Sequence, residues 1–274
     1  LSAKVETGLT HLVDTCGTGG SGIGIFNVST ASAFVASQCG AKVAKHGNRS
    51  ATRSSGSADL LEQAGVPLTL KPTEVADCIK NIGLGFMFAP AHHSAMKHVV
   101  GPRKEIAQKS IFNVLGPLTN PASAKRQFMG VYDKKWMRPI TNVLKELGSE
   151  HTMIIHSEDG LDEISIASPT FVIEMKDGDI SEYTIRPEDF NFKTSTLNGL
   201  RVNSPEESLN LVKLALVDKH QEASSMISMA AGAALYVSEV SSSLEAGILL
   251  ANECVKDGGG IEKLNQLIEH TSKF

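Results

Sequence analysis

The sequence lacks the features that mark several classes of protein. Its four cysteines (Cys16, Cys39, Cys78 and Cys254) are far apart and include no CxxC pair. This excludes the usual zinc spacings and a disulfide framework, and it indicates a reducing, cytoplasmic setting. No uninterrupted apolar segment approaches the roughly 20 residues that span a bilayer, and the first residues do not resemble a signal peptide. A net charge of −4 argues against a protein that coats nucleic acid.

What is present indicates a globular protein with an α/β sheet. Hydrophobic residues make up 41% of the 274 residues and charged residues 20%, which is typical of a folded domain. From residue 12 to residue 156 short apolar runs alternate with helical patterns, which predicts a mostly parallel central sheet surrounded by helices. We expect a first strand that begins at 12–13 and further strands at 41–44, 85–88, 127–132 and 152–156. Helices are expected at 31–36, 57–64, 72–82 (with Thr73 as its cap), 92–108 and 134–147.

The second half of the chain changes character. Alternating apolar and polar residues over 159–185, with a turn at 176–179, predict antiparallel strands appended to the sheet. After residue 203 the pattern is helical, and Ser204 to Glu207 form a capping box with proline at the first helical position. Further helices are expected at 222–237 and 243–256, followed by a last short helix.

A glycine-rich stretch follows the first apolar run. Residues 14–30 contain five glycines within eight positions, Gly17, Gly19, Gly20, Gly22 and Gly24. Consecutive N–H groups in such a loop form a concave site for phosphate oxygens. Polar residues then stand just before the helical segment, where a helix N-terminus adds to an anion site; these are Asn27, Ser29 and Thr30. A surface turn is the alternative, but the position between a strand and a helix favours phosphate binding.

A second candidate anion loop follows the next strand. Lys45, Arg49 and Arg53 fall within nine residues, accompanied by Thr52, Ser54, Ser55 and Ser57. Cations and hydroxyls both bind phosphate oxygens, although a solvated basic loop fits this stretch equally well. Because the glycine loop lies one strand–helix unit upstream, the two loops are expected to converge on one polyphosphate.

Three carboxylates lie in a predicted turn after a strand, namely Asp159, Asp162 and Glu163. Mg²⁺ is usually held by one or two carboxylates together with substrate phosphates, and adjacent Asp162 and Glu163 could each face a different ion. An acidic β-turn is the plain alternative.

Two further segments complete the set. One is a patch of His92, His93, Lys97, His98 and Arg103, in which Arg103 is suited to a carboxylate-bearing substrate. For His92 and His98 a structural or surface role is favoured over catalysis. The other, residues 111–121, has no charge and two prolines, and it is expected to form a rigid, partly buried loop.

Taken together, the motifs resemble anthranilate phosphoribosyltransferases over essentially the whole chain. They are Asp14-x-x-Gly-Thr-Gly-Gly, Asn27-Val-Ser-Thr30, Lys45-His-Gly-Asn-Arg49, Ser55-Gly-Ser-Ala-Asp59, Phe112-Asn-x-Leu-Gly-Pro-Leu-Thr-Asn-Pro121 and Asp159-Gly-Leu-Asp-Glu163. The resemblance implies transfer of the phosphoribosyl group from 5-phosphoribosyl 1-diphosphate to anthranilate, a step of tryptophan biosynthesis. It implies small-molecule substrates, no nucleic-acid or membrane partner, and no catalytic general base.

The resemblance also implies roles for particular residues and for domains. Residues 11–274 would be the α/β domain that binds the phosphoribosyl donor, residues 1–10 a remnant of an N-terminal helical domain, and helices near 91–115 part of an incomplete small helical domain. The resemblance implies a homodimer, in which N-terminal helices that would precede residue 1 supply much of the contact between subunits. The donor site would comprise Gly17, Gly19, Gly20, Ser21, Asn27, Val28, Ser29, Thr30, Lys45, His46, Gly47, Asn48, Arg49, Arg53 and Ser57. The anthranilate site would comprise Gly17, Asn48, His93 and Arg103, and the Mg²⁺ ligands would be Ser29, Asp162 and Glu163.

The chain departs from the family pattern at a few positions. Ser21 replaces an aspartate, Ile25 replaces a hydroxyl residue, Arg53-Ser54 replaces Ser-Lys, and Ser94 replaces a proline. The substitution at Ser21 removes a carboxylate beside the diphosphate loop and bears on metal dependence. Two alternative functions are a pyrimidine-type nucleoside phosphorylase, which shares the architecture, and an inactive transferase homologue with a binding role.

Overall fold

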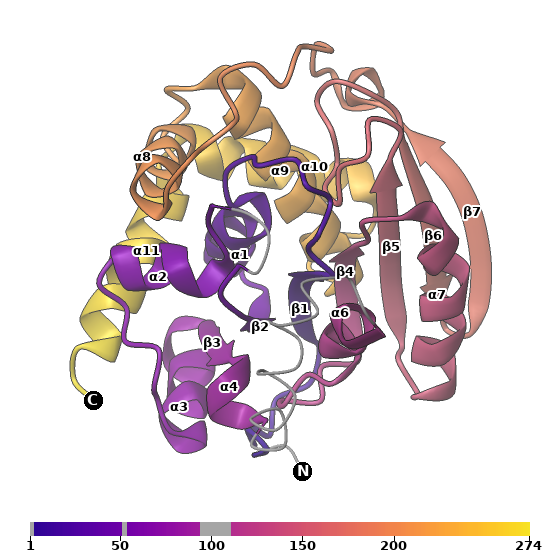
Figure 1. The fold of residues 1–274 in the computed structure, drawn as a ribbon. Helices are drawn as coiled ribbons and strands as arrows, with labels where there is room; N and C mark the ends of the chain where they lie inside the picture. The colour runs from indigo at the N-terminus through magenta and orange to yellow at the C-terminus, as the bar shows by residue number, and fades with distance from the viewer. Residues whose placement is uncertain (1–2, 51–53, 94–110) are drawn as a thin grey trace.

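The central element of the structure, a computed structural model, is a seven-stranded sheet. Residues 3–50, 54–93 and 111–274 are described, and in them the strands lie in the order β3-β2-β1-β4-β5-β6-β7, with β3 and β7 at the edges (Figure 1). Strands β1 to β5 are parallel, whereas β6 and β7 are antiparallel to their neighbours. The strands are β1 (Leu12–Gly17), β2 (Lys42–Gly47), β3 (Leu84–Phe88), β4 (Arg126–Gly130), β5 (His151–Ser157), β6 (Thr170–Lys176) and β7 (Asp179–Ile185).

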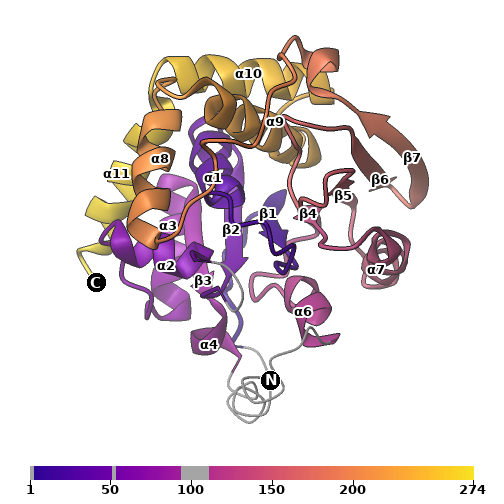
Figure 2. The same ribbon diagram turned by 45° about the horizontal axis from the view of Figure 1, so that its top comes forward.

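Helices cover both faces of this sheet. Figure 2 shows α8, α9 and α10 gathered around α1 on one side, and α6 and α7 on the other. The helices are α1 (Val28–Gln38), α2 (Ser57–Gln63), α3 (Pro72–Ile82), α4 (Ala89–His92), α6 (Ile111–Leu115), α7 (Met137–Glu146), α8 (Pro205–Ala215), α9 (Gln221–Val237), α10 (Leu244–Lys256) and α11 (Gly259–Thr271), with single 3₁₀ turns at η2 (Gly116–Leu118), η3 (Lys134–Trp136) and η4 (Pro187–Phe190). No helix in the described part of the chain has the length and apolar character needed to cross a membrane.

Alternate strand residues supply separate cores to the two faces. Val13, Val43 and Phe128 belong to the core shared with α1 and α9. The neighbouring residues Ala44 and Met129 face the opposite side, where α3 and α7 pack. Successive side chains of a strand point to opposite faces, and both faces of the central strands are covered. This agrees with the short apolar runs in some of these strands, such as Met153 to Ile155 in β5, which do not alternate with polar residues.

The order of the strands determines where a ligand can bind. β1 lies between β2 and β4, so the chain first extends the sheet to one side of β1 and later to the other. Ligands of open α/β sheets bind beyond the carboxyl ends of the strands at such a reversal. The motifs that follow β1, β2 and β5 therefore emerge at the edge of the sheet where a site is expected.

The predicted fold class is confirmed, and several local predictions need correction. Helix α1 begins at Val28, so Ser29 and Thr30 lie in its first turn and not before it. Thr73 is not the cap of α3, because the N-cap is Lys71 and its N–H is bonded by the Glu74 carboxylate. Residues 111–118 form α6 and η2, where a loop was expected. The predicted helix at 92–108 lies largely outside the described residues.

Candidate active site

The glycine-rich loop after β1 is fixed by a distant segment. Gly19, Gly20 and Gly22 have φ of 61°, 84° and 77°, in the left-handed region that glycine adopts without steric cost. The following residues pair with 200–202: the Phe26 N–H donates to Leu200 O at 3.0 Å, the Val202 N–H donates to Gly24 O at 2.9 Å, and Ile25 and Arg201 form an antiparallel bridge. No local pattern in the sequence indicated this segment as the support of the loop.

Asn27, the N-cap residue of α1, joins three parts of the chain. Its Oδ1 accepts hydrogen bonds from Ser55 Oγ and Ser208 Oγ, both at 2.7 Å, and its Nδ2 donates to Ser55 O at 3.3 Å. One turn into the helix, Thr30 Oγ1 donates to Ser57 Oγ at 3.1 Å. The start of α1 is therefore held against the loop that follows β2, and the two predicted anion-binding segments do meet.

Lys45 is a buried cation at the junction of β1, β2 and α1. Its side chain is 2% exposed, and its ammonium group donates to Thr15 O and lies 3.4 Å from Thr15 Oγ1 and 3.5 Å from Ser29 Oγ. Burial lowers the pKa of Lys45, and the charges of Asp14 and Glu163 oppose that effect. Lys45 is thus placed among residues of the predicted donor and metal sites.

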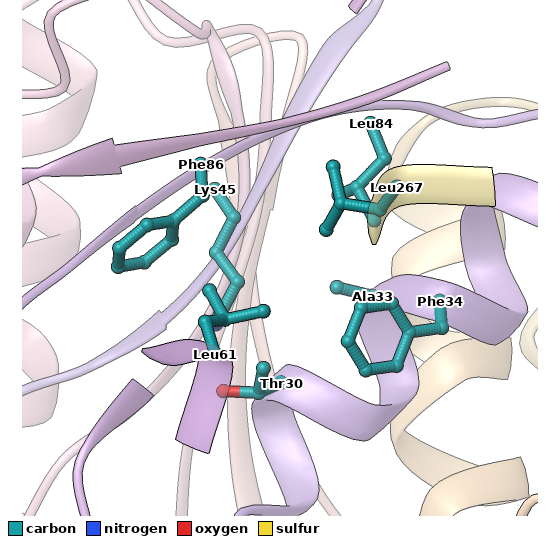
Figure 3. Close-up of a pocket in the computed structure, with 8 residues that line it drawn as sticks. All are labelled: Thr30, Ala33, Phe34, Lys45, Leu61, Leu84, Phe86 and Leu267. Atoms are coloured by element: carbon teal, nitrogen blue, oxygen red, sulfur yellow. The ribbon is translucent and has the colours of Figure 1, made fainter. Parts of the chain in front are cut away.

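The stem of Lys45 crosses an apolar layer. Figure 3 shows a small cavity beside it, of about 10 Å³, which is no larger than the space that one water molecule needs. Its lining residues are Thr30, Ala33, Phe34, Lys45, Leu61, Leu84, Phe86 and Leu267. A larger cavity, of about 380 Å³, lies at β6, β7 and the start of α10, away from every motif described above. The smaller cavity is lined by Thr30 and Lys45 of the predicted donor site, but neither cavity is lined by the glycine-rich loop or the acidic loop.

His46 and His93 bring β2 and the end of α4 together. Their Nε2 atoms lie 3.2 Å apart, and their ring centroids are 5.0 Å apart. Burial and, to a smaller degree, the charge of His93 lower the pKa of His46 to about 3, and burial also lowers the pKa of His93, so both rings are neutral near pH 7. The neighbouring His92 is buried and bonds Ala3 O through Nδ1 at 3.2 Å, in agreement with the structural role expected for it.

The loop after β2 is organised by carboxylates of α2. The Arg49 guanidinium bonds both Glu62 oxygens, at 2.7 and 2.8 Å, and Asp59 Oδ1 at 3.1 Å. Asp59 Oδ2 also accepts the N–H groups of Ser50 and Gly56. Arg49 is therefore engaged within the protein while its role toward a phosphoribosyl donor stays a prediction. Arg53, predicted beside it, lies outside the described residues.

The acidic loop after β5 separates into a structural part and a part that faces the site. Asp159 Oδ2 accepts from Ser165 Oγ at 2.6 Å, and its Oδ1 accepts the Leu161 N–H at 3.2 Å, so Asp159 shapes the loop. Asp162 and Glu163 are 5% and 7% exposed. A Cβ added at Gly17 would lie 3.6 Å from Asp162 Oδ2, which places this carboxylate at the end of β1.

These two carboxylates fit a Mg²⁺ ion that is bound together with a substrate. Among the described residues, no group of three or more His, Cys, Asp and Glu side chains is arranged to hold a metal ion. Mg²⁺ sites of phosphate-handling enzymes commonly use one or two carboxylates and complete the shell with substrate phosphates and water. Asp162 and Glu163 are two adjacent, buried carboxylates beside a glycine-rich loop, and they therefore match this kind of Mg²⁺ site.

The described residues of the predicted sites converge at the carboxyl ends of the parallel strands. The elements that carry them are the glycine loop, the start of α1, the end of β2 with its loop, the end of α4, and the acidic loop. Arg103, predicted to bind anthranilate, lies outside the described residues, as does Arg53. The structure adds two supports that the sequence did not indicate, Ser208 and the segment 200–202.

Comparison with known proteins first defines the class. The family model described as "Glycosyl transferase family, a/b domain" matches residues 9–261. The structure also aligns with that of anthranilate phosphoribosyltransferase from Thermus thermophilus, at a TM-score of 0.92 and 36% identity, over 99% of this chain and 81% of that one. The chain is therefore a member of this glycosyl transferase family.

The particular family follows from the sequence relatives. Anthranilate phosphoribosyltransferase of Ectopseudomonas mendocina is 54% identical over 278 residues, which cover all of this chain and 80% of that protein. The Saccharomyces cerevisiae enzyme, solved in complex with PRPP and Mg, aligns at a TM-score of 0.89 with 28% identity over 100% of this chain and 77% of that one. The chain belongs to the anthranilate phosphoribosyltransferase family.

Proposed function

We propose that this protein transfers the phosphoribosyl group of 5-phosphoribosyl 1-diphosphate (PRPP) to the amine of anthranilate and releases diphosphate. The observation that carries the proposal is the convergence of the glycine loop, buried Lys45 and the Asp162–Glu163 pair at the carboxyl ends of the parallel strands. The relatives described above carry the same activity in their names. They favour this reaction over a nucleoside phosphorylase or a purely binding homologue.

The reaction needs stabilisation of a departing diphosphate. Breaking the bond at the anomeric carbon leaves negative charge on the diphosphate and positive charge on the ribose. The N–H groups of the glycine loop and of the first turn of α1 supply fixed positive dipoles for those oxygens, and Lys45 supplies a full charge. Mg²⁺, held by Asp162, Glu163 and Ser29 together with the substrate, would neutralise diphosphate charge.

Anthranilate binding is proposed for the side of the site that contains His93. Gly17 is the last residue of β1, Asn48 directly follows β2, and His93 follows α4. Arg103 is proposed to pair with the anthranilate carboxylate. The yeast relative has also been solved in complex with 4-fluoroanthranilate, at a TM-score of 0.88 and 27% identity. Because an aromatic amine is already a nucleophile, orientation beside the anomeric carbon replaces a general base.

Further proposals concern the context of the enzyme. Residues 11–274 form the PRPP-binding domain, and helices near 91–115 belong to a small helical domain, to which residues 1–10 lead. A homodimer is proposed on the family resemblance, and a cytoplasmic location on the free thiols of all four cysteines.

A fluorescence assay tests the reaction. Anthranilate fluorescence is followed with purified protein, PRPP and Mg²⁺, and we expect loss of the signal at a rate proportional to the protein concentration. A steady signal, accompanied by phosphorolysis of uridine or thymidine in parallel samples, would overturn the proposal in favour of a nucleoside phosphorylase. A steady signal with neither reaction would favour a binding role.

The metal ligands are tested by removing charge without changing size. Asp162→Asn combined with Glu163→Gln is expected to raise the Mg²⁺ concentration for half-maximal rate by at least about tenfold, because a hard cation prefers charged oxygen ligands. Glu158→Gln is the control, since it changes an exposed carboxylate of the same loop. An unaltered Mg²⁺ titration in the double variant would refute the ligand assignment.

A further inference from the structure

Strands β1 and β2 separate before they reach the site. Their register pairs end at Val13↔Val43, whereas β1 stays paired with β4 as far as Gly17↔Gly130. The backbone groups of β2 beyond this point that face β1 have no ladder partner. Buried backbone donors and acceptors nevertheless require partners, so side chains must supply them.

Two polar side chains supply these partners. Asp14, fully buried on β1, accepts the His46 N–H through Oδ1 at 3.0 Å. Asn120, 106 residues away, donates through Nδ2 to Asp14 Oδ2 at 2.8 Å and to Ala44 O at 2.9 Å. Its Oδ1 accepts the Ala122 N–H at 2.8 Å, which fixes the direction of the carboxamide. The Asn120 carboxamide therefore connects β1 and β2 to each other and to the loop on which Asn120 lies.

We infer that Asp14 and Asn120 are positioning residues for phosphoribosyl transfer, because their side chains replace the missing ladder and set the spacing of the loops that follow β1 and β2. The inference rests on the proposed function. The loop after β1 contains the glycine-rich segment, and the end of β2 with the loop after it contains Lys45 to Arg49. A change in their spacing would misalign the groups that hold the diphosphate.

The chemistry of the pair makes its role testable by pH. Burial raises the pKa of Asp14 to about 6, and the bonds from Asn120 and His46 together with the charge of Lys45 limit the rise. The groups that act on this carboxylate are Lys45 and His46 from β2, Cys16 from β1, and Asn120. Protonation of Asp14 converts one acceptor oxygen into a donor, so a hydrogen bond from Asn120 or from the His46 N–H is weakened below its pKa.

The decisive variant is Asn120→Asp, which places two carboxylates at hydrogen-bond distance. Such a pair cannot bear both charges and takes up a shared proton. We expect kcat at pH 8 to fall about 100-fold, the size of effect that a misplacement of about 1 Å produces. This kcat should recover as the pH is lowered toward 6, whereas kcat of the unchanged protein falls over the same range.

A second variant exchanges the two residues, Asp14→Asn with Asn120→Asp. It restores a donor and an acceptor, and its kcat at pH 8 should be at least about tenfold higher than that of Asn120→Asp alone.

Asn81→Asp is the matched control, because Asn81 donates to Asp77 at the same 2.8 Å on the exposed surface of α3. It should leave kcat and its pH profile unchanged. The inference is overturned if Asn120→Asp keeps the normal rate at pH 8, or if its loss is independent of pH and the exchanged pair does not reduce it. Circular dichroism gives the folded fraction, by which each kcat is corrected. If Asn120→Asp does not fold, Asn120→Ala decides: a corrected kcat close to normal overturns the inference. An inactive unchanged protein would instead count against the proposed function.

Discussion

At the scale of single residues, the tightest approach near the site is between Gly130 and Asp162. A Cβ on Gly130 would lie 1.8 Å from the backbone oxygen of Asp162 and 2.6 Å from its carbonyl carbon. Real Cβ atoms do not come so close, so any side chain at Gly130 would displace the acidic loop. The requirement for glycine here is steric and not conformational, because φ at Gly130 does not lie in the left-handed region.

Gly130→Ala is therefore expected to impair catalysis more than folding. Displacement of Asp162 and Glu163 by about 1 Å should reduce kcat/KM for PRPP by roughly 100-fold, as measured by anthranilate fluorescence at saturating Mg²⁺. Gly148→Ala is the control: its φ of 78° strains the backbone, but nothing surrounds the added Cβ. It should lower the melting temperature and leave kcat/KM intact. Equal losses of activity in both variants would contradict this account.

At the scale of elements, the short helix α2 controls the loop that follows β2. Asp59 caps the helix through the Gly56 N–H at 2.8 Å, bonds the Ser50 N–H at 3.0 Å, and pairs with Arg49. One carboxylate thus joins both ends of the loop. The contact of Arg49 with Glu62 is exposed, and exposed pairs contribute little to stability.

Removal of these two carboxylates should have different consequences. Asp59→Ala is expected to lower the free energy of unfolding by about 1–2 kcal/mol, the usual range for a lost cap, and to raise KM for PRPP because the loop loses its anchor. Glu62→Gln should leave both the melting temperature and KM unchanged. Thermal unfolding and steady-state kinetics measure the two effects. If Glu62→Gln raised KM as much as Asp59→Ala, the Arg49 pair and not the cap would be the anchor.

At the scale of the whole molecule, two adjacent groups oppose one another in the pH dependence of stability. The pKa of Asp14 is raised from 3.8 to about 6 in the fold, so its contribution to stability is present at low pH and is lost as pH rises through about 6. The pKa of His46 is lowered from 6.5 to about 3, so its contribution is present above 6.5 and is lost as pH falls. Between about pH 4 and 6 the two slopes have opposite signs.

In Asp14→Asn the pH-dependent contribution of His46 to stability is no longer opposed by that of Asp14. We expect the free energy of unfolding of this variant, relative to the unchanged protein, to fall by about 1.4 kcal/mol per pH unit between about pH 6 and pH 4. Urea denaturation at three pH values measures the slope. A difference that does not vary with pH would show that the fold does not raise the pKa of Asp14.

Features that depend on neighbouring residues can be predicted from the sequence alone. The glycine-rich loop, the cap of α8 at Ser204 and the succession of strands and helices each follow from backbone preferences or local burial. The Ser204 hydroxyl accepts the Glu207 N–H as predicted, while the Glu207 carboxylate bonds the N–H of Asn203, not that of Ser204. Even within this local motif, the N–H group that the Glu207 carboxylate bonds depends on the three-dimensional path of the chain.

Contacts between residues far apart in the sequence depend on the folded arrangement of the chain and could not be predicted. Asn27 and Ser208 are 181 positions apart, and Asp14 and Asn120 are 106 apart. Periodicity reports which face of a strand or helix is buried, but it does not specify the partner that a buried polar group finds across the fold. The backbone groups left unpaired between β1 and β2 create the need for such partners, and this need exists only once the two strands lie side by side.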